Sequence, residues 1–368
     1  MILPTHTIGL VGIVSGSFGA GHDAAAHAIA EQLEGRGFAT RIWDIVDLMP
    51  GPFGRALRAG YLRQIRSLPG SWRWLLHRLE RDERLAGLIA RAMNSASKPL
   101  LDIAEARPDR IVSTHPFASQ ALGQLRADGQ LDIPVATYLT DMSVHSLWIH
   151  PSVDLHLGVH DLPSDEARRL GAGVTRTIRP AVPAAFSEIP TSAAAKADAR
   201  SALGLPRDGR LALVTGGSCG IGRLAESAAD IAATGQAVPV VLCGRNDRLL
   251  RRIRRSASAI GLGWTDNMPQ VLTAADAVVQ NSGGFTSLET LAAGLPILTY
   301  NCIAGHGETN AAALDRAGLA SWVKDADDLA PALRRALSFG SPGERLDAAQ
   351  PNLTVADAIF AASRLRSA

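Results

Sequence analysis

The fold is decided by a stretch near the start of the chain, IGLVGIVSGSFGAGHDAAAHAIAEQLE, which covers residues 8–34. Its apolar first part predicts a strand over 8–15, and its second part, rich in small residues, predicts a helix over 22–34. Glycines in the connecting loop let the backbone approach a ligand closely, and the free amides at a helix start favour an anion. Such a unit is typical of open α/β sheets, in which ligands bind beyond the carboxyl ends of the strands.

The alternation of strand and helix continues along the chain in two series. The strands of the first series are predicted over 8–15, 38–44, 110–114, 133–139, 154–159 and 174–178, and those of the second over 210–215, 238–243, 259–263, 276–280, 295–299 and 319–323. Helices are predicted over 22–34, 72–94, 116–126, 163–170, 222–233, 246–257, 285–293, 309–317, 326–338 and 354–366. A proline-containing segment over 179–195 looks like a linker between the two series.

The composition fits a folded protein with two domains. The chain has 368 residues, of which 46% are hydrophobic and 20% charged, which excludes disorder, collagen-like repeats and a disulfide-stapled miniprotein. A formal charge of +2 gives no argument for a nucleic-acid partner. The three cysteines form no CxxC pair and fit a reducing, cytoplasmic setting, and no apolar run reaches the ~18 residues that would span a membrane.

One segment breaks the alternation. Residues 51–100 carry ten Lys or Arg residues against three acids, and aromatic residues lie among them at Phe53, Tyr61, Trp72 and Trp74. A basic amphipathic helix of this kind can lie in a membrane interface, or it can cover a core with its arginines in water. Both interpretations stay open.

Polar residues end several strands of the first series. His22 would stand at a helix start and could act as a general base near neutral pH, although a glycine-rich turn capped by a histidine is a simpler alternative. The stretches Ser113–Pro116 and Thr140–Ser143 each end a predicted strand and should reach the same edge of the sheet. Asp141 is a candidate second acid or base, or a residue that orients His22; an N-cap is the alternative.

The second series offers three clusters. The loop Gly216–Gly222 can hold a phosphate at a helix start. Glu289 falls one turn inside a helix that opens at Gly283–Gly284, where a carboxylate could accept both ribose hydroxyls of a nucleotide. The loop Gly305–Asn310 could hydrogen-bond a sugar, or Glu308 could simply stabilise the first turn of its helix. No histidine, cysteine or acid spacing predicts a metal site.

The loop Thr215–Gly222 also reads TGxxxGIG, the nucleotide fingerprint of short-chain dehydrogenases. Those enzymes need a tyrosine followed four residues later by a lysine, whereas positions 65, 142 and 304 after the three tyrosines are Ile, Met and Ala. The first half of the chain would also be left unexplained, so the oxidoreductase is the weaker interpretation.

Taken together, the motifs resemble the monogalactosyldiacylglycerol synthase branch of the GT-B glycosyltransferases, which includes processive diacylglycerol glycosyltransferases and is related to the peptidoglycan lipid-intermediate N-acetylglucosaminyltransferase. The stretches that carry the resemblance appear in the family's order: Gly19–His22, Ser113–Pro116, Leu139–Asp141, Trp148–Pro151, Gly216–Ser218, Cys243–Asn246 and Ser282–Pro296. Each is weak alone, and their order over two α/β halves is what makes the set specific.

The resemblance implies a GT-B fold, in which two Rossmann-like domains face a central cleft. Residues 1–180, joined by a tail helix within 352–368, would bind the acceptor, and residues 181–351 would bind the nucleotide-sugar. The reaction implied is an inverting, metal-independent transfer of a hexose or N-acetylhexosamine from a UDP-sugar, without a cofactor, to the hydroxyl of a lipid such as diacylglycerol or of a natural product.

The resemblance also assigns residues. His22 and Asp141 would be catalytic, and Gly19, Gly21, His115 and Thr140 would contact the acceptor. The donor would be bound by Gly216, Gly217, Ser218, Gly244, Arg245, Asn246, Ser282, Gly283, Gly284, Thr286, Glu289, His306, Glu308 and Asn310. Segment 51–100 would touch an anionic membrane, making the protein peripheral on the inner face of the membrane.

The chain departs from the family pattern at His306 and Gly307, where relatives usually have a glutamine, often followed by an acidic residue. In those relatives the glutamine meets the sugar hydroxyls. The identity of the sugar is therefore open. Two rival functions also stay open: a UDP-sugar 2-epimerase of the same fold, and a binder of nucleotide-sugars without catalysis.

Overall fold

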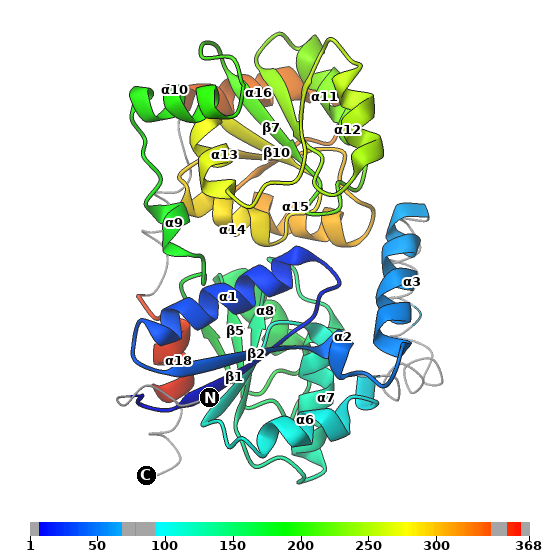
Figure 1. The fold of residues 1–368 in the computed structure, drawn as a ribbon, viewed down its shortest axis with the longest axis vertical. Helices are drawn as coiled ribbons and strands as arrows, with labels where there is room; N and C mark the ends of the chain where they lie inside the picture. Colours follow the sequence, from blue (N-terminus) through cyan, green and yellow to red (C-terminus); the bar gives the residue numbers. More distant parts are fainter. Residues whose placement is uncertain (1–6, 68–77, 79–92, 340–351, 362–368) are drawn as a thin grey trace. The chain divides into compact units, whose positions relative to one another are not determined.

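In the computed structural model, the structure describes residues 7–67, 78, 93–339 and 352–361, and the chain divides into two compact units (Figure 1). Unit 1 comprises Met1–Ala181 and Gln350–Ala368, and unit 2 comprises Val182–Ala349. The division falls inside the proline-containing segment 179–195. That segment is not wholly a linker, because it contains a short helix, α9 (Ala184–Ser187), and the start of α10 (Ala193–Ala202).

Unit 1 is built on a six-stranded parallel sheet in the order β2-β1-β3-β4-β5-β6. Its strands are β1 (Leu10–Ser15), β2 (Ala39–Asp44), β3 (Arg110–Ser113), β4 (Val135–Leu139), β5 (Leu155–Gly158) and β6 (Thr175–Thr177). The chain changes direction across the sheet between β1 and β3. In open α/β sheets such a switch point is where ligands bind, beyond the carboxyl ends of the strands.

Helices cover this sheet. They are α1 (Ala20–Glu34), α2 (Ile45–Leu48), α3 (Phe53–Ser67), α6 (Ser97–Ala104), α7 (Pro116–Ala127), the 3-10 turn η1 (Ser146–Trp148) and α8 (Asp161–Arg169). One apolar cluster joins the strand residues Val14 and Ile111 to Leu100 of α6 and Leu122 of α7. Because β-strands point alternate side chains to opposite faces, this leaves Ile13 and Val112, also fully buried, for the other face.

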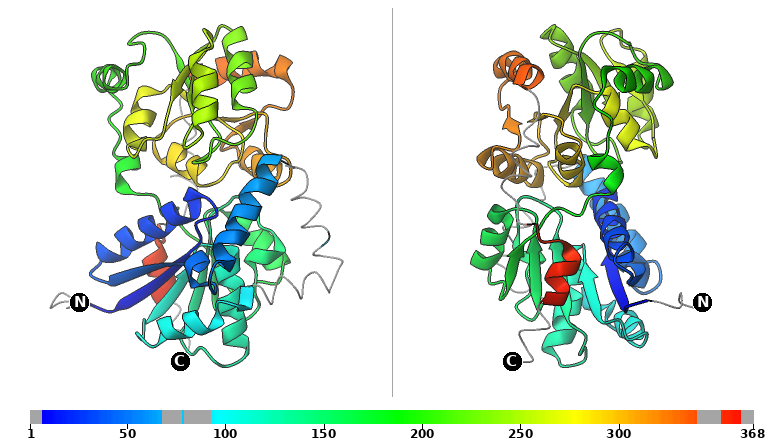
Figure 2. Two further views of the ribbon diagram at one scale, coloured as in Figure 1. Left: turned by 45° about the vertical axis from the view of Figure 1, so that its right-hand side comes forward. Right: turned by 90° about the vertical axis from the view of Figure 1, so that its left-hand side faces the viewer.

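The end of the described chain returns to unit 1. Helix α18 (Val355–Ala361) contacts α1 and β5, and Figure 2 shows it in red against the first sheet. Asp357 forms an ion pair with Arg36, the ring of Phe360 stacks on Phe38 at 4.4 Å between centroids, and the Arg179 amide donates to the Leu353 carbonyl at 2.9 Å. These contacts tie the tail to the unit in which the chain begins.

Unit 2 has a second six-stranded parallel sheet, in the order β12-β11-β10-β7-β8-β9. The strands are β7 (Leu211–Thr215), β8 (Val238–Leu242), β9 (Ile260–Leu262), β10 (Ala277–Gln280), β11 (Ile297–Thr299) and β12 (Ser321–Trp322). This is the strand order of dinucleotide-binding sheets, and its switch point lies between β7 and β10.

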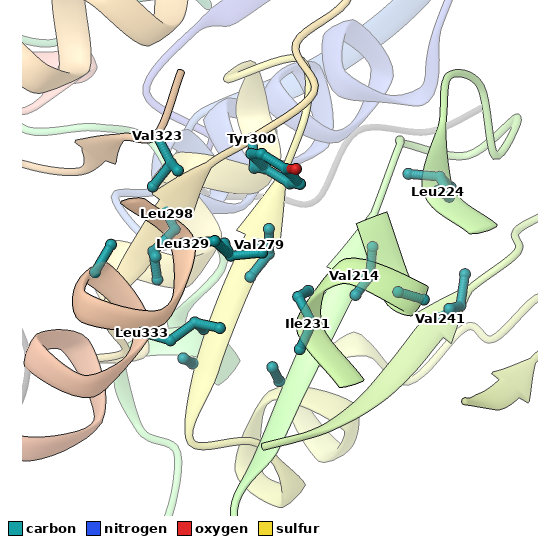
Figure 3. Close-up of a cluster of buried hydrophobic side chains, with 14 of the residues drawn as sticks. Val214, Leu224, Ile231, Val241, Val279, Leu298, Tyr300, Val323, Leu329 and Leu333 are labelled. Carbon is teal, nitrogen blue, oxygen red and sulfur yellow. The ribbon is translucent and has the colours of Figure 1, made fainter. Parts of the chain in front are cut away.

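Successive side chains of a strand point to opposite faces of the sheet, so unit 2 has an apolar cluster on each face. Val214, Val241 and Val279 face α11 (Leu224–Ala233), α12 (Asp247–Arg254) and α16 (Leu329–Phe339), and Figure 3 shows this cluster. Their neighbours Leu213 and Val240 face α10 and α13 (Met268–Ala274). The remaining elements are α14 (Phe285–Ala292), α15 (His306–Arg316) and the 3-10 turn η2 (Ala326–Asp328).

Each expected strand is confirmed within a few residues, whereas several helices differ. The helix expected over 222–233 begins only at Leu224, because Gly220 and Gly222 have φ angles of +52° and +99° that a helix cannot use. Helix α15 begins three residues earlier than expected, at His306. The helix expected over 72–94 lies almost wholly outside the described residues. Among the described helices, none has the length and apolar character that crossing a bilayer requires.

Candidate active site

His22 lies in the first turn of α1, at the switch point of unit 1, and Thr114 holds it from two sides. The Nδ1 atom of the imidazole lies 2.7 Å from the Thr114 carbonyl oxygen, which follows β3. The Thr114 hydroxyl donates in turn to the main-chain carbonyl of His22 at 3.1 Å. The first strand-to-helix loop is thereby fastened to the loop that follows the neighbouring strand.

This geometry sets the tautomer of His22. A carbonyl oxygen can only accept, so Nδ1 carries the hydrogen, and in the neutral ring Nε2 is left with a lone pair. The Thr140 hydroxyl lies 3.4 Å from Nδ1 and offers the same hydrogen a weaker second acceptor. A neutral imidazole that is protonated on Nδ1 takes up a further proton on Nε2, and proton uptake from a substrate hydroxyl is what a general base requires.

The side chains around His22 are mostly aromatic and buried. The His115 ring meets it edge-on at 4.6 Å between centroids, and Trp148 lies 5.8 Å away. His115 is the N-cap of α7, its Nδ1 accepts from the Phe117 amide at 3.2 Å, and Phe18 stacks on its ring. Burial holds the pKa of His115 well below its usual range, so this ring is neutral beside His22. Its predicted contact with the acceptor stays a prediction.

The other unit 1 residues predicted for catalysis or for the acceptor gather near the same edge. Asp141 is 7% exposed and follows β4, and no helix begins there, so it is not an N-cap. Burial and the charge of Asp141 together raise the pKa of Tyr61, on α3, to about 12. Gly19 is the N-cap of α1 and makes no side-chain cap, and Gly21 stands in its first turn. These residues thus lie near one edge of the sheet of unit 1, and their roles in catalysis and in acceptor binding stay predictions.

In unit 2, two glycine-rich loops pack on each other beyond β7 and β8. A Cβ atom on Gly220 would lie 2.3 Å from the Cys243 carbonyl oxygen, and one on Gly244 would lie 2.3 Å from the Ser218 carbonyl oxygen. The Arg245 amide donates to that Ser218 carbonyl at 2.9 Å, and the Asn246 side chain donates to the Gly220 carbonyl at 3.0 Å. Asn246 also caps α12, so its amide is used to hold the loops together.

The switch point of unit 2 joins the loop after β7 to the loop after β10. Asn281 is 2% exposed, and its amide nitrogen donates to the Ile221 carbonyl at 2.8 Å. Helix α14 then opens at Gly284 without a side-chain cap, so the amides of its first turn point beyond the sheet. Amides in this position, beside Ser282, Gly283 and Thr286, are suited to an anion.

Glu289 lies one turn inside α14 and is partly buried. Among the residues that the structure describes, no hydrogen bond or ion pair satisfies its carboxyl group. Burial raises the pKa of Glu289 to about 8. A carboxyl group that is desolvated yet unpartnered inside the protein is suited to a ligand with hydroxyl groups, because each hydroxyl can donate to it.

The loop and helix start over Gly305–Asn310, which follow β11, form hydrogen bonds mainly within the protein. Glu308 accepts from the Gly305 amide at 3.0 Å and completes a capping box at the start of α15. Asn310 is fully buried; its side-chain nitrogen donates to the Ser282 carbonyl at 3.3 Å and lies 3.2 Å from the His306 Nε2. Glu308 therefore stabilises the first turn of its helix, which was one of the two roles expected for it. Contacts of the three residues with a sugar stay predictions.

In the described part of the chain, no group of three or more His, Cys, Asp or Glu side chains is placed to bind a metal ion.

Comparison with known proteins identifies both halves. The family model described as monogalactosyldiacylglycerol (MGDG) synthase matches residues 22–177, and the model described as glycosyl transferases group 1 matches residues 213–338. The first match begins at His22 itself. Both halves of the chain are therefore similar to glycosyltransferases, and the set of matches resembles the monogalactosyldiacylglycerol synthase branch of the GT-B glycosyltransferases.

Individual relatives agree with this branch. A processive diacylglycerol beta-glucosyltransferase of Bacillus cereus is 24% identical over 253 residues, which cover 66% of this chain and 63% of the relative. This chain therefore matches somewhat less than two thirds of the length of such relatives. Among solved structures, Acinetobacter baumannii MurG is 14% identical with a TM-score of 0.51, covering 92% of this chain and 98% of that one. Arabidopsis thaliana UGT89C1 complexed with UDP is 17% identical with a TM-score of 0.58, covering 93% and 94%. These likenesses establish the GT-B fold.

Two residues of this GT-B chain were missed by the sequence analysis. Thr114 was noted at a strand end without a role, and only the structure shows that it clamps His22. Trp264 follows β9 and is 44% exposed, and the Arg245 guanidinium lies 4.2 Å from the centroid of its ring. A tryptophan directly after a predicted strand, at the same sheet edge as the glycine-rich loops, is a signal that the sequence carries.

Proposed function

We propose that the protein is an inverting glycosyltransferase that moves a hexose from a UDP-sugar to the hydroxyl of a diacylglycerol-like lipid. The observation that carries the proposal is the clamp on His22, which fixes Nδ1 as the donor and leaves Nε2 as the base. The matches to two glycosyltransferase families and to diacylglycerol glucosyltransferases supply the substrate class. Glucose is accordingly the first donor sugar to test.

The proposed step is a single displacement. Nε2 of His22 takes the hydroxyl proton of the acceptor, the acceptor oxygen forms a bond to the anomeric carbon, and the bond from that carbon to the diphosphate oxygen breaks with both electrons leaving on UDP. The attacking and leaving oxygens stand on opposite faces of the anomeric carbon, so its configuration inverts. Asp141, near the same sheet edge, would stabilise the imidazolium that forms.

On the donor side, the protein must stabilise the departing diphosphate. Backbone amides of the loop Gly216–Arg223 and of the first turn of α14 would do so, because amides fixed in advance stabilise charge without reorganising. Glu289 would accept hydrogen bonds from the ribose hydroxyls, and the ring of Trp264 would stack on the uracil of the donor. The proposal requires the sugar of the donor bound by unit 2 to react with the acceptor hydroxyl that His22 of unit 1 deprotonates.

On the acceptor side, a lipid substrate calls for contact with a bilayer. Helix α3 presents Phe53, which is 39% exposed, together with the exposed Arg55 and Arg63. An aromatic and cations on one exposed stretch suit an anionic membrane surface. Trp72, Trp74 and Arg73, which also supported a membrane surface, lie outside the described residues. We propose a peripheral position on the inner face of the membrane.

The test is a reaction containing the full chain, UDP-glucose and diacylglycerol vesicles, with UDP release and glycolipid formation measured together. The proposal expects one UDP released for each glucosylated lipid. Conversion of the UDP-sugar to its 2-epimer without any acceptor would show the rival epimerase, and binding of UDP with no turnover of UDP-glucose, UDP-galactose or UDP-N-acetylglucosamine would show the rival binder. Soluble aromatic acceptors, run alongside, separate a natural-product enzyme from a lipid enzyme.

A further inference from the structure

We propose that three buried hydroxyl groups, those of Ser113, Ser119 and Thr137, are positioning residues for His22. They act through the peptide plane between Thr114 and His115 and hold the imidazole in its Nδ1-protonated form. The inference rests on the proposed function in one respect, namely that His22 is the base of the reaction.

The three hydroxyls form one network under the switch point of unit 1. Ser113 ends β3, Thr137 lies beside it on β4 in the same register, and Ser119 comes from the first turns of α7. All three residues are fully buried. The Thr137 hydroxyl donates to the Ser119 oxygen at 2.9 Å, and the Ser119 and Ser113 oxygens lie 2.9 Å apart.

The network forms hydrogen bonds to the peptide group between Thr114 and His115, whose carbonyl orients His22. The Thr114 carbonyl accepts from His22 Nδ1, and the amide of the same peptide plane, that of His115, donates to the Ser113 oxygen at 3.3 Å. The next carbonyl, that of His115, accepts from the Ser113 hydroxyl at 2.9 Å and the Ser119 hydroxyl at 3.2 Å. Rotation of either peptide would therefore break hydrogen bonds in a region closed to water, where unsatisfied groups are costly.

A fixed carbonyl matters because the neutral imidazole has two tautomers. If the Thr114 carbonyl turns away, its preference for a hydrogen on Nδ1 is lost, and a ring protonated on Nε2 cannot accept a proton from a substrate there. The nearby Thr140 hydroxyl can donate as well as accept, so it cannot enforce one tautomer by itself. Only an acceptor without a hydrogen, held in place, selects the form that acts as a base.

A second site in the same unit supplies a matched control. Helix α8 also begins after a strand with a histidine N-cap, His160, and Ser164 stands four residues later, as Ser119 does after His115. The Ser164 hydroxyl donates to the His160 carbonyl at 3.1 Å and lies 3.0 Å from the Thr177 hydroxyl. Ser164 is fully buried as well, yet none of its hydrogen bonds reaches the Thr114 peptide.

The experiment compares S113A, T137V and T137S with S164A in the full-length protein. Selective ¹⁵N labelling of histidine reports the tautomer of His22 without donor or acceptor present, and the signal is assigned with H22Q. In the wild type we expect Nδ1 protonated. In S113A and T137V we expect a mixture of tautomers and a kcat about 10- to 100-fold lower, with the KM for the donor unchanged. T137S, which keeps the hydroxyl, and S164A should match the wild type.

The thermal unfolding transition of each variant shows whether it folds. If S113A does not fold, T137V tests the same hydroxyl network. If folded S113A or T137V keeps the single Nδ1 tautomer and the wild-type kcat, the inference is wrong. Equal loss of kcat in S164A would also overturn it, because the hydroxyls would then serve stability alone. If the wild type has no transferase activity but the tautomer shifts as expected, the proposed function fails and the positioning role stands.

Discussion

His22 owes its orientation to a main-chain carbonyl, not to a carboxylate. Its Nδ1 donates to Thr114, whereas the adjacent Asp23 accepts from the Ser15 hydroxyl at 2.6 Å. A peptide carbonyl carries no formal charge and does not titrate, so the tautomer it selects does not depend on pH. A search of the sequence for a His–Asp pair would therefore not find the residue that orients His22.

The first prediction at this scale concerns the base itself. His22→Ala should lower kcat by about 10²- to 10⁴-fold, because it removes the group proposed to take the acceptor proton, while the affinity for UDP is retained. The control is His27→Ala, which removes an exposed histidine five residues later on the same helix. Unchanged turnover in His22→Ala, measured by UDP release, would remove His22 from the mechanism.

Glu289 gives a prediction with a defined pH range. Its pKa rises from 4.5 to about 8 on folding because of burial, so ionisation opposes the folded state, and stability falls as pH rises from about 4.5 to 8. Glu289→Gln removes this cost. It should stabilise the protein by about 1–3 kcal/mol at pH 8, with a smaller gain at pH 5.

The same substitution should weaken UDP binding at pH 8 and above, where Glu289 is at least half ionised, since an amide accepts two ribose hydroxyls less well than a carboxylate. Denaturant unfolding at the two pH values and calorimetric titration with UDP measure both effects. A variant that is less stable than the wild type at pH 8, or that binds UDP equally well, would remove Glu289 from the ribose site.

At the scale of elements, the donor loops depend on the close approach of two backbones. Gly244→Ala would bring a Cβ atom to 2.3 Å from the Ser218 carbonyl, at a φ of +55°. Gly235→Ala is the matched control: its φ is +63°, and nothing lies within 4 Å of the added atom.

Both substitutions should cost about 1 kcal/mol or more for the backbone conformation alone. Only Gly244→Ala should displace the loop Gly216–Arg223 and weaken UDP binding, by about tenfold or more. The measurement is the Kd for UDP of each variant beside its free energy of unfolding. Equal affinities in the two variants would show that the packing of the loops does not shape the donor site.

Helix α3 carries the prediction about the membrane. Arg55→Glu combined with Arg63→Glu should reduce binding to vesicles rich in phosphatidylglycerol by at least about tenfold, because each charge near an anionic surface contributes about 1 kcal/mol. Arg107→Glu with Arg169→Glu makes the same change in charge at exposed positions away from α3. Vesicle sedimentation distinguishes them, and equal losses in both pairs would point to net charge instead of a docking helix.

The elements also show what the sequence could predict. The buried parallel strands form apolar runs bounded by turns, and all of the expected strands are present. The helices α2, α3, α6, α10 and α13 were not expected. Three of them, α2, α6 and α13, have eight residues or fewer, which is too short for a clear helical period, and α2 and α13 begin at side-chain caps, such as Asp44, whose carboxylate accepts from the Val46 amide. The residues at the strand ends could be predicted as a group, whereas the hydrogen bonds that orient each one depend on tertiary contacts.

For the whole molecule, the sequence predicts which residues gather at each switch point, and the structure shows both groups in place within their own units. Under the proposed function each unit would supply half of a glycosyl transfer: unit 1 would supply His22 as the base, and unit 2 would supply two glycine-rich loops for the diphosphate and the carboxyl group of Glu289. The account requires the two halves to act on one substrate pair.

The measurement that tests this most directly is ¹H NMR of the product formed from UDP-α-glucose and diacylglycerol. We predict a single β-linked glucosyl lipid, whose anomeric proton shows the large H1–H2 coupling constant of two axial protons. One UDP should be released for each glycosidic bond formed. An α-linked product, or consumption of the UDP-sugar without any lipid product, would contradict a direct displacement assisted by His22.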